Sequence, residues 1–314
     1  MTKKDNSLSN EEEVQSEHHS KKSKKYKKII IGIVIFIVVV IAVILVWLYT
    51  GQVSNAKKKV FSNVPLPVAV VEISPISSTK LFQREKLIQQ ILKSANQPST
   101  NITDQILDQL IESEKIEILA SKNHLSVNSS DIDIAYKAIL NQFPGANEEE
   151  LKKALQQNYG LDLRTFKNEA LRQVVLQDKL SKWFNEQESL NSEPYKRARD
   201  IIKELDNGGD FEELANKYNQ DTSSQDFAGD NGFVALSDLL PEFQDGIKDL
   251  AIGDKKLIAS RYGLHIVKVL AIEEKDVDGK KVKNYNLRQI FIKPNDFIKW
   301  FTDQSSKIRS FKLI

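Results

Sequence analysis

Residues 253–271 read Gly-Asp-Lys-Lys-Leu-Ile-Ala-Ser-Arg-Tyr-Gly-Leu-His-Ile-Val-Lys-Val-Leu-Ala, and this stretch decides how the last third of the chain folds. A Gly253-Asp254 turn precedes a short apolar run at 256–259, and a second run at 265–271 is rich in Ile and Val. β-Branched residues bounded by turn residues are typical of strands. The stretch therefore predicts two strands of a small antiparallel sheet, in a chain that otherwise reads as helical. The expected fold class is α+β.

Helical and loop patterns precede these strands. Residues 195–210 are amphipathic and end at an Asn-Gly-Gly sequence, and Asp210 caps a second short helix. A polar loop at 219–224 follows, and then Gly-Asp-Asn-Gly-Phe at 229–233. Leu-Pro-Glu-Phe at 240–243 opens a further helix.

The order of these motifs resembles the parvulin peptidyl-prolyl isomerases. The motifs are G-G-D-F-x-x-L-A-x-x-Y, D-x-x-S, G-D-x-G, L-P-E-F, L-x-x-G-D and Y-G-L-H-I-V-K-V, in that order. The resemblance implies cis/trans isomerisation of Xaa-Pro bonds, without a cofactor or a metal. It assigns Leu240 and Phe243 to the proline pocket and Asp221 to the loop near the twisting bond. His265 then matches the strand histidine, and Ser260 is a hydroxyl residue that supports it.

Each of these residues also has a purely structural interpretation. Leu240 and Phe243 fit a plain hydrophobic core, and Asp221 fits the cap of a turn. His265 fits a buried structural histidine in an apolar strand. The sequence leaves the two interpretations open.

One departure from the parvulin pattern affects the chemistry. Parvulins begin with a strand of the type R-x-R-H-I-L, whereas here Ser-Glu-Pro-Tyr at 192–195 leads straight into a helix. Residues 286–293 resemble the missing strand, and a linker at 273–285 with an Asp278-Gly279 turn would return the chain beside His265. This order resembles a circular permutation. The alternative is a truncated domain followed by the start of a second one.

The permutation places Gln289 where the family has its first histidine. Glutamine donates and accepts hydrogen bonds but does not titrate. The resemblance therefore implies either an isomerase of reduced activity or a domain that only binds.

Residues 67–190 are predicted to be mostly helical, behind a short strand at 68–71. The segments ILDQLIESEKIEILASKNHLSVNSSDI and FKNEALRQVVLQDKL resemble the N-terminal chaperone module of SurA/PrsA-type foldases. That resemblance implies a broad groove that cradles unfolded polypeptide.

The charge and apolar pattern of the N-terminal residues predicts that the chain is anchored in a membrane. Residues 1–28 carry eight Lys against five acidic residues, a charge of +3, and residues 29–48 contain no charged residue. Twenty helical residues span a hydrocarbon core of roughly 30 Å. We expect residues 29–49 to be a single-pass anchor, with the basic tail in the cytoplasm and the bulk of the chain outside. A cleavable signal peptide and a buried core helix are the alternatives, and both fit the length and uniformity of the stretch less well.

Composition excludes several function classes. The chain has 314 residues, with 45 Lys and Arg against 43 Asp and Glu, a balance that argues against a dedicated nucleic-acid binder. It has no cysteine, which excludes thiol catalysis, disulfides and thiolate metal sites. Four histidines leave little material for a metal centre.

The expected organisation has five segments, namely a cytoplasmic tail at 1–28, an anchor at 29–49, a linker at 50–66, a helical chaperone domain at 67–190 and a parvulin-like domain at 191–314. The expected function is that of a membrane-anchored foldase outside the cytoplasm. Its partners would be unfolded exported polypeptides with Xaa-Pro bonds and, through residues 29–49, the lipid bilayer. The alternatives are a holdase whose parvulin-like domain only binds peptide and a scaffold that docks one envelope partner.

Overall fold

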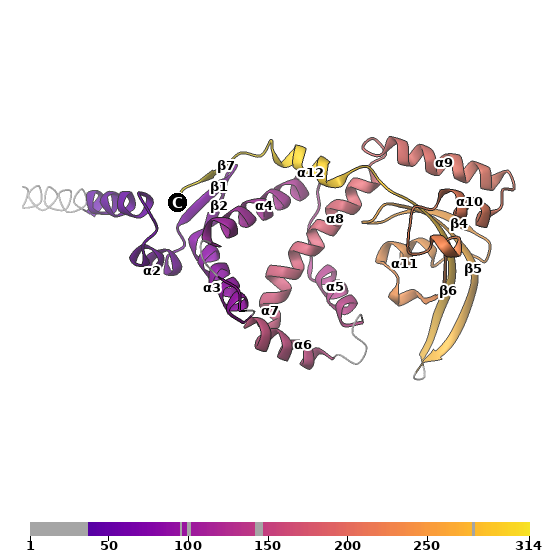
Figure 1. Ribbon diagram of the computed structural model, residues 1–314, viewed down its shortest axis with the longest axis horizontal. Helices are drawn as coiled ribbons and strands as arrows, with labels where there is room; N and C mark the ends of the chain where they lie inside the picture. Colours follow the sequence, from indigo (N-terminus) through magenta and orange to yellow (C-terminus); the bar gives the residue numbers. More distant parts are fainter. Residues whose placement is uncertain (1–36, 95, 99–101, 142–146, 278–279) are drawn as a thin grey trace, which may run out of the picture.

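The computed structural model describes residues 37–94, 96–98, 102–141, 147–277 and 280–314. The described residues form a mostly helical part followed by a part built on a four-stranded sheet (Figure 1). Both sheets are antiparallel, so the α+β class with small antiparallel sheets predicted from sequence is confirmed.

The helical part packs its helices around a small sheet with the strand order β2-β1-β7. Its strands are β1 Pro67–Val71, β2 Ser74–Ser77 and β7 Ser310–Lys312. Its helices are α2 Asn55–Asn63, α3 Ser78–Ser94, α4 Ile102–Lys122, α5 Ser129–Asn141, α6 Glu148–Ala154, α7 Leu163–Thr165, α8 Arg172–Glu186 and α12 Phe297–Ser305, with π-helical turns at Leu155–Tyr159 and Phe166–Leu171.

The sheet part has the strand order β3-β6-β5-β4. Its elements are α9 Ser192–Asp206, α10 Phe211–Tyr218, β3 Asp230–Ala235, α11 Pro241–Ile247, β4 Lys255–Ala259, β5 Leu264–Val277 and β6 Lys280–Ile292. Helices α9 and α10 pack on one face, against Leu264, Ile266, Ile290 and Ile292. Helix α11 packs on the other face, against Val267, Val269, Tyr285 and Leu287. Side chains alternate between faces along a strand, so His265 lies on the α11 face.

The C-terminal residues pack with the helical part, although we predicted residues 191–314 to form one unit. Strand β7 pairs with β1 through the register Val70↔Phe311, so the C-terminal strand lies beside the first strand of the described chain (Figure 1). Ile308 is buried in the core of this part, and the Trp300 ring packs at a tilt against Trp183 and Phe184 of α8. Burial of these apolar side chains holds the segment there.

Two stretches predicted as linkers are regular structure. Residues 50–66 contain helix α2, whose Phe61 is fully buried and stacks on Phe82 with a ring separation of 6.1 Å. Residues 273–285 continue β5 and open β6, which pair from Leu264↔Ile292 to Val277↔Lys280. The predicted Asp278-Gly279 turn lies outside the described residues.

The predicted membrane anchor falls partly on residues 29–36, which lie outside the described part, as does the whole tail 1–28. Residues 37–49 are helical, and most of their apolar side chains are exposed. Leu48 is buried, and the Tyr49 hydroxyl donates to the Pro67 carbonyl at 2.8 Å. Within the described residues, no helix has both the length and the apolar character needed to cross a membrane.

Candidate active site

Strands β5 and β6 bring His265 and Gln289 onto one face of the sheet. His265 lies opposite Phe291 and Val267 lies opposite Gln289, so His265 and Gln289 are diagonal neighbours across the pair. The His265 Nδ1 atom lies 3.0 Å from Gln289 Oε1. This contact joins residues 24 positions apart in sequence.

A single chain of hydrogen bonds links four of the predicted site residues. Gln289 Nε2 donates to Asp221 Oδ2 at 3.1 Å, and His265 Nε2 lies 2.8 Å from Ser260 Oγ. The Tyr262 main-chain N–H donates to the same Ser260 oxygen at 3.0 Å. Asp221, Gln289, His265 and Ser260 thus come together from a loop, two strands and the β4–β5 turn.

The Asp221 carboxylate determines the direction of the bonds at its end of this chain. A carboxylate accepts only, so Gln289 turns its amide NH₂ toward Asp221 and its oxygen toward His265. His265 Nδ1 must then carry the hydrogen. Ser260 Oγ accepts from Tyr262 and, when the imidazole is neutral, donates to the bare Nε2. In its neutral form the imidazole is therefore the tautomer protonated on Nδ1.

Burial also favours the neutral form of the His265 imidazole. Its side chain is 6% exposed, and burial lowers its pKa from 6.5 to about 4, although Gln289 and Asp221 oppose this shift. The rings of Phe243 and Phe291 lie against it, with centroid separations of 4.8 and 4.9 Å. His265 is thus a neutral hydrogen-bonding group in an aromatic setting at neutral pH.

Asp221 is the anionic end of the chain. Burial raises its pKa, but hydrogen bonds from Ser223 and Ser224 and the nearby His265 more than offset this, so the pKa lies below its usual value. Ser223 donates through both its main-chain N–H and its hydroxyl, at 3.0 and 2.7 Å. Asp221 therefore caps a turn and also accepts a hydrogen bond from Gln289. Its interpretation as a turn cap is compatible with its interpretation as a site residue.

Gly229 allows β6 to approach the preceding loop. The Gln289 main-chain N–H donates to the Gly229 carbonyl at 2.9 Å. A Cβ atom at Gly229 would lie 1.9 Å from the Gln289 carbonyl oxygen, and φ is +75° there. Only glycine fits both the contact and this left-handed conformation. The G-D-x-G motif carried this signal in sequence, but the partner strand was not evident from it.

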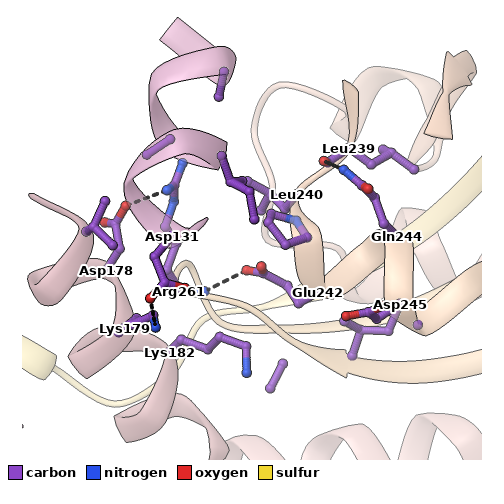
Figure 2. A pocket seen from close by; sticks show the side chains of 18 of the residues that line it. Asp131, Asp178, Lys179, Lys182, Leu239, Leu240, Glu242, Gln244, Asp245 and Arg261 are labelled. Atoms are coloured by element: carbon purple, nitrogen blue, oxygen red, sulfur yellow. Dashed lines mark hydrogen bonds and ion pairs between the residues drawn. The ribbon is translucent and has the colours of Figure 1, made fainter. Parts of the chain in front are cut away.

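Leu240 lies apart from the hydrogen-bonded chain, in a groove between the two parts of the molecule. This groove has a volume of about 1460 Å³, and its walls come from α5 and α8 on one side and from α11 and β4 on the other. Figure 2 shows Leu240 and Glu242 facing the side of the groove where Arg261 meets Asp178. His265, Gln289, Asp221 and Phe243 do not line it. Leu240 does pack against the same apolar cluster as Phe243, which links the groove to the site.

No metal centre is indicated in the part of the chain that the structure describes. It contains no group of three or more His, Asp or Glu side chains placed to hold an ion.

The burial of His265 predicts a specific dependence of stability on pH. The unfolded chain binds a proton at His265 below about pH 6.5, whereas the folded chain does so only near its pKa of about 4. The unfolded state thus holds more protons in this window, and the free energy of unfolding falls as the pH is lowered from about 6.5 to about 4. The loss is roughly 3 kcal/mol from this group.

Urea unfolding of the wild type and of His265→Gln across this pH range checks the effect. We expect the difference in the free energy of unfolding between the two proteins to shrink toward pH 4. Only the wild type loses stability through proton binding to His265 in the unfolded state, because glutamine does not titrate. Contributions from carboxylates are common to both proteins and cancel in the difference. Parallel curves would show that His265 is not buried in its neutral form.

Comparison with known proteins gives two family matches that overlap along the chain. Residues 21–181, about half of the chain, match the SurA-like N-terminal domain, and residues 162–273 match the PPIC-type PPIase domain. The second match includes Asp221, Leu240, Phe243, Ser260 and His265. It ends before Gln289.

Two relatives and one solved structure illustrate the similarity. The foldase protein PrsA of Caldanaerobacter subterraneus subsp. tengcongensis is 26% identical over 300 residues, covering 86% of this chain and 94% of that protein. The chaperone SurA of Legionella pneumophila (strain Lens) is 30% identical over 120 residues, which are 38% of this chain and 28% of that protein. The crystal structure of the foldase protein PrsA from Streptococcus pneumoniae covers 70% of this chain and 79% of its own, at 13% identity and a TM-score of 0.24. The chain belongs to the family defined by the SurA-like N-terminal domain and carries a PPIC-type PPIase domain behind it.

Proposed function

We propose that this protein is a membrane-anchored foldase that binds unfolded exported polypeptides and catalyses the cis/trans isomerisation of their Xaa-Pro bonds. The observation that carries the proposal is the hydrogen-bonded chain from Asp221 through Gln289 and His265 to Ser260, packed against Phe243. The family match and the relatives named foldase and chaperone support the general role.

The chemistry of the reaction suits such a site. Rotation about an Xaa-Pro bond meets a barrier of roughly 18–20 kcal/mol, although the two isomers differ by only about 0.5–1 kcal/mol. Catalysis requires an apolar seat for the proline ring and surroundings that favour the twisted amide over the planar one. It requires no proton transfer and no cofactor. A neutral His265 held in one tautomer is compatible with this demand.

Gln289 completes the hydrogen-bonded chain. It accepts from His265 Nδ1 and donates to Asp221, so its amide orients the imidazole and is itself oriented by the carboxylate. A titrating side chain is not needed for either contact. We therefore propose that the site keeps isomerase activity with glutamine at this position.

A circularly permuted parvulin domain is part of the proposal. Strand β6 is an inner strand of the sheet, between β3 and β5, yet it follows every other element of that sheet in sequence. It also lies beyond the residues that match the PPIC-type domain. An inner strand that comes last in sequence is the order that the proposed permutation predicts.

A specific observation favours the alternative of a holdase that only binds. Phe243 and Gln289 are 8% and 9% exposed, so the aromatic pocket around His265 is nearly closed to solvent. The open groove lies beside it and reaches Leu240. Binding in the groove without access to His265 would hold a client and leave its proline bonds unchanged.

The test is the cis/trans exchange of Xaa-Pro peptides, measured by NMR with and without the protein. We expect acceleration by the wild type and a loss of about tenfold in Leu240→Ala, because the proline ring loses part of its apolar contact. Ile252→Ala is the matched control, since Ile252 is an exposed aliphatic residue on the same part of the molecule, away from the groove. A folded wild type that suppresses client aggregation without accelerating exchange would establish the holdase.

The proposed location rests on the sequence and on the exposed apolar side chains of residues 37–47. We propose that residues 29–49 anchor the chain with the tail 1–28 in the cytoplasm. Docking of Leu48 and Tyr49 on the helical part would then hold that part close to the bilayer.

Single-cysteine labelling tests this topology cleanly, because the chain has no cysteine of its own. Ser306→Cys is at an exposed position, and we expect a membrane-impermeant maleimide to label it on bacterial cells whose outer surface is accessible. Ser23→Cys, in the basic tail, should be labelled only after the membrane is permeabilised. The reverse pattern, or equal labelling of both, would contradict the proposed orientation.

A further inference from the structure

Three side chains on one face of helix α8, in the helical part, contact the turn between β4 and β5 through hydrogen bonds and an ion pair. Asp178, Ser181 and Asn185 are spaced three and four residues apart and therefore line one side of the helix. Asp178 accepts from the Arg261 guanidinium at 2.5 Å, and the Ser181 hydroxyl donates to the Arg261 carbonyl at 2.9 Å. Figure 2 shows Arg261 directed at Asp178 across the end of the groove.

Asn185 makes the innermost of these contacts. Its Nδ2 atom donates to the Ser260 carbonyl at 2.8 Å, and its side chain is 1% exposed. Its Oδ1 atom is buried and has no hydrogen-bond partner in the described part of the chain. A buried amide with an unsatisfied acceptor is costly to keep, so packing alone does not account for an asparagine here.

The turn that α8 holds is the one that presents Ser260 to His265. Ser260 Oγ lies 2.8 Å from His265 Nε2 and accepts the Tyr262 N–H. On its opposite side the turn abuts β6, since a Cβ atom at Gly263 would lie 2.8 Å from the Ile292 carbonyl oxygen. The Ser260–Gly263 turn is therefore fixed between α8 and β6, and its serine hydroxyl is aimed at the imidazole.

We propose that Asn185, with Ser181, is a positioning residue of the isomerase site, acting from the helical part through the main chain of Ser260–Arg261 on the hydroxyl that orients His265. The inference rests on the proposed isomerase function, to which it adds residues outside the sheet part. On this proposal, His265 is correctly oriented only when α8 is packed against the Ser260–Gly263 turn. The helical part then contributes to the site as well as to the groove.

Asn185→Leu in the full chain in detergent micelles is the test. Leucine has a similar volume, and the Ser260 carbonyl keeps a second donor, the Gly263 N–H at 3.3 Å, so no new buried group is left without a partner. We expect hydrogen–deuterium exchange of the Tyr262 amide to become roughly fivefold faster, because its acceptor is the displaced Ser260 hydroxyl. We expect the catalysed Xaa-Pro exchange rate to fall by at least about fivefold.

Two further variants make the result interpretable. Ser181→Ala removes one contact to the same turn and should shift both readouts in the same direction, and it decides the matter should Asn185→Leu fail to fold. Asn123→Leu is the matched control, since Asn123 Nδ2 also donates to a main-chain carbonyl at 2.8 Å, but at the end of α4. It should change neither readout.

Unchanged Tyr262 exchange in folded Asn185→Leu and Ser181→Ala would overturn the positioning role. Faster Tyr262 exchange with an unchanged isomerisation rate would overturn it as well, because the contact would then be structural only. A wild type without isomerase activity would defeat the proposed function instead. The Tyr262 amide would still decide whether α8 positions Ser260.

Discussion

The hydrogen bond between His265 and Gln289 is the contact on which the site depends, and the pairing of β5 with β6 produces it. Strand β6 lies inside the sheet, so its removal would separate β3 from β5 as well as expose the imidazole. Gly229 allows the loop that carries Asp221 to approach this strand, and the Asp221 carboxylate then sets the orientation of the Gln289 amide. Fold and site therefore share one element, and a disturbance of β6 affects both.

The site that results has a fixed charge state and a fixed tautomer. The anion at one end turns the Gln289 amide so that its oxygen accepts from His265 Nδ1, and a neutral ring then accepts from Ser260 at Nε2. Desolvation by the surrounding aromatic rings keeps the imidazole neutral. An isomerase can use such a rigid site with a neutral imidazole, because the reaction breaks no covalent bond and moves no proton. The same enclosure limits access, so the distinction between isomerase and holdase depends on whether the Phe243 pocket opens to a client in the groove.

Local patterns predicted much of this, and contacts distant in sequence explain what they missed. The strands at 256–259 and 265–271 and the helices on both sides followed from apolar periodicity and turn residues. The position of Gln289 beside His265 followed from the resemblance of residues 286–293 to the first strand of the parvulins. The pairing of β7 with β1 did not, because a three-residue strand at 310–312 carries no signal for a partner some 240 positions away. Helix α2 was also missed, since a Lys-rich segment whose buried residues are only Lys57 and Phe61 has the pattern of a polar linker. Asn185 offered no sequence signal at all, because its importance comes only from the carbonyl it contacts.

The most direct test of this account is the ¹⁵N NMR signature of the His265 imidazole in the wild-type protein. The account predicts one protonated nitrogen, Nδ1, and one unprotonated nitrogen, Nε2, with no change from neutral pH down to about pH 5, well above the pKa of about 4. Loss of this pattern in Gln289→Leu, which removes the acceptor for Nδ1, would tie it to the contact between the two strands. A wild-type ring protonated on Nε2, or one that gains its second proton near pH 6.5, would contradict the hydrogen-bonded chain and the site built on it.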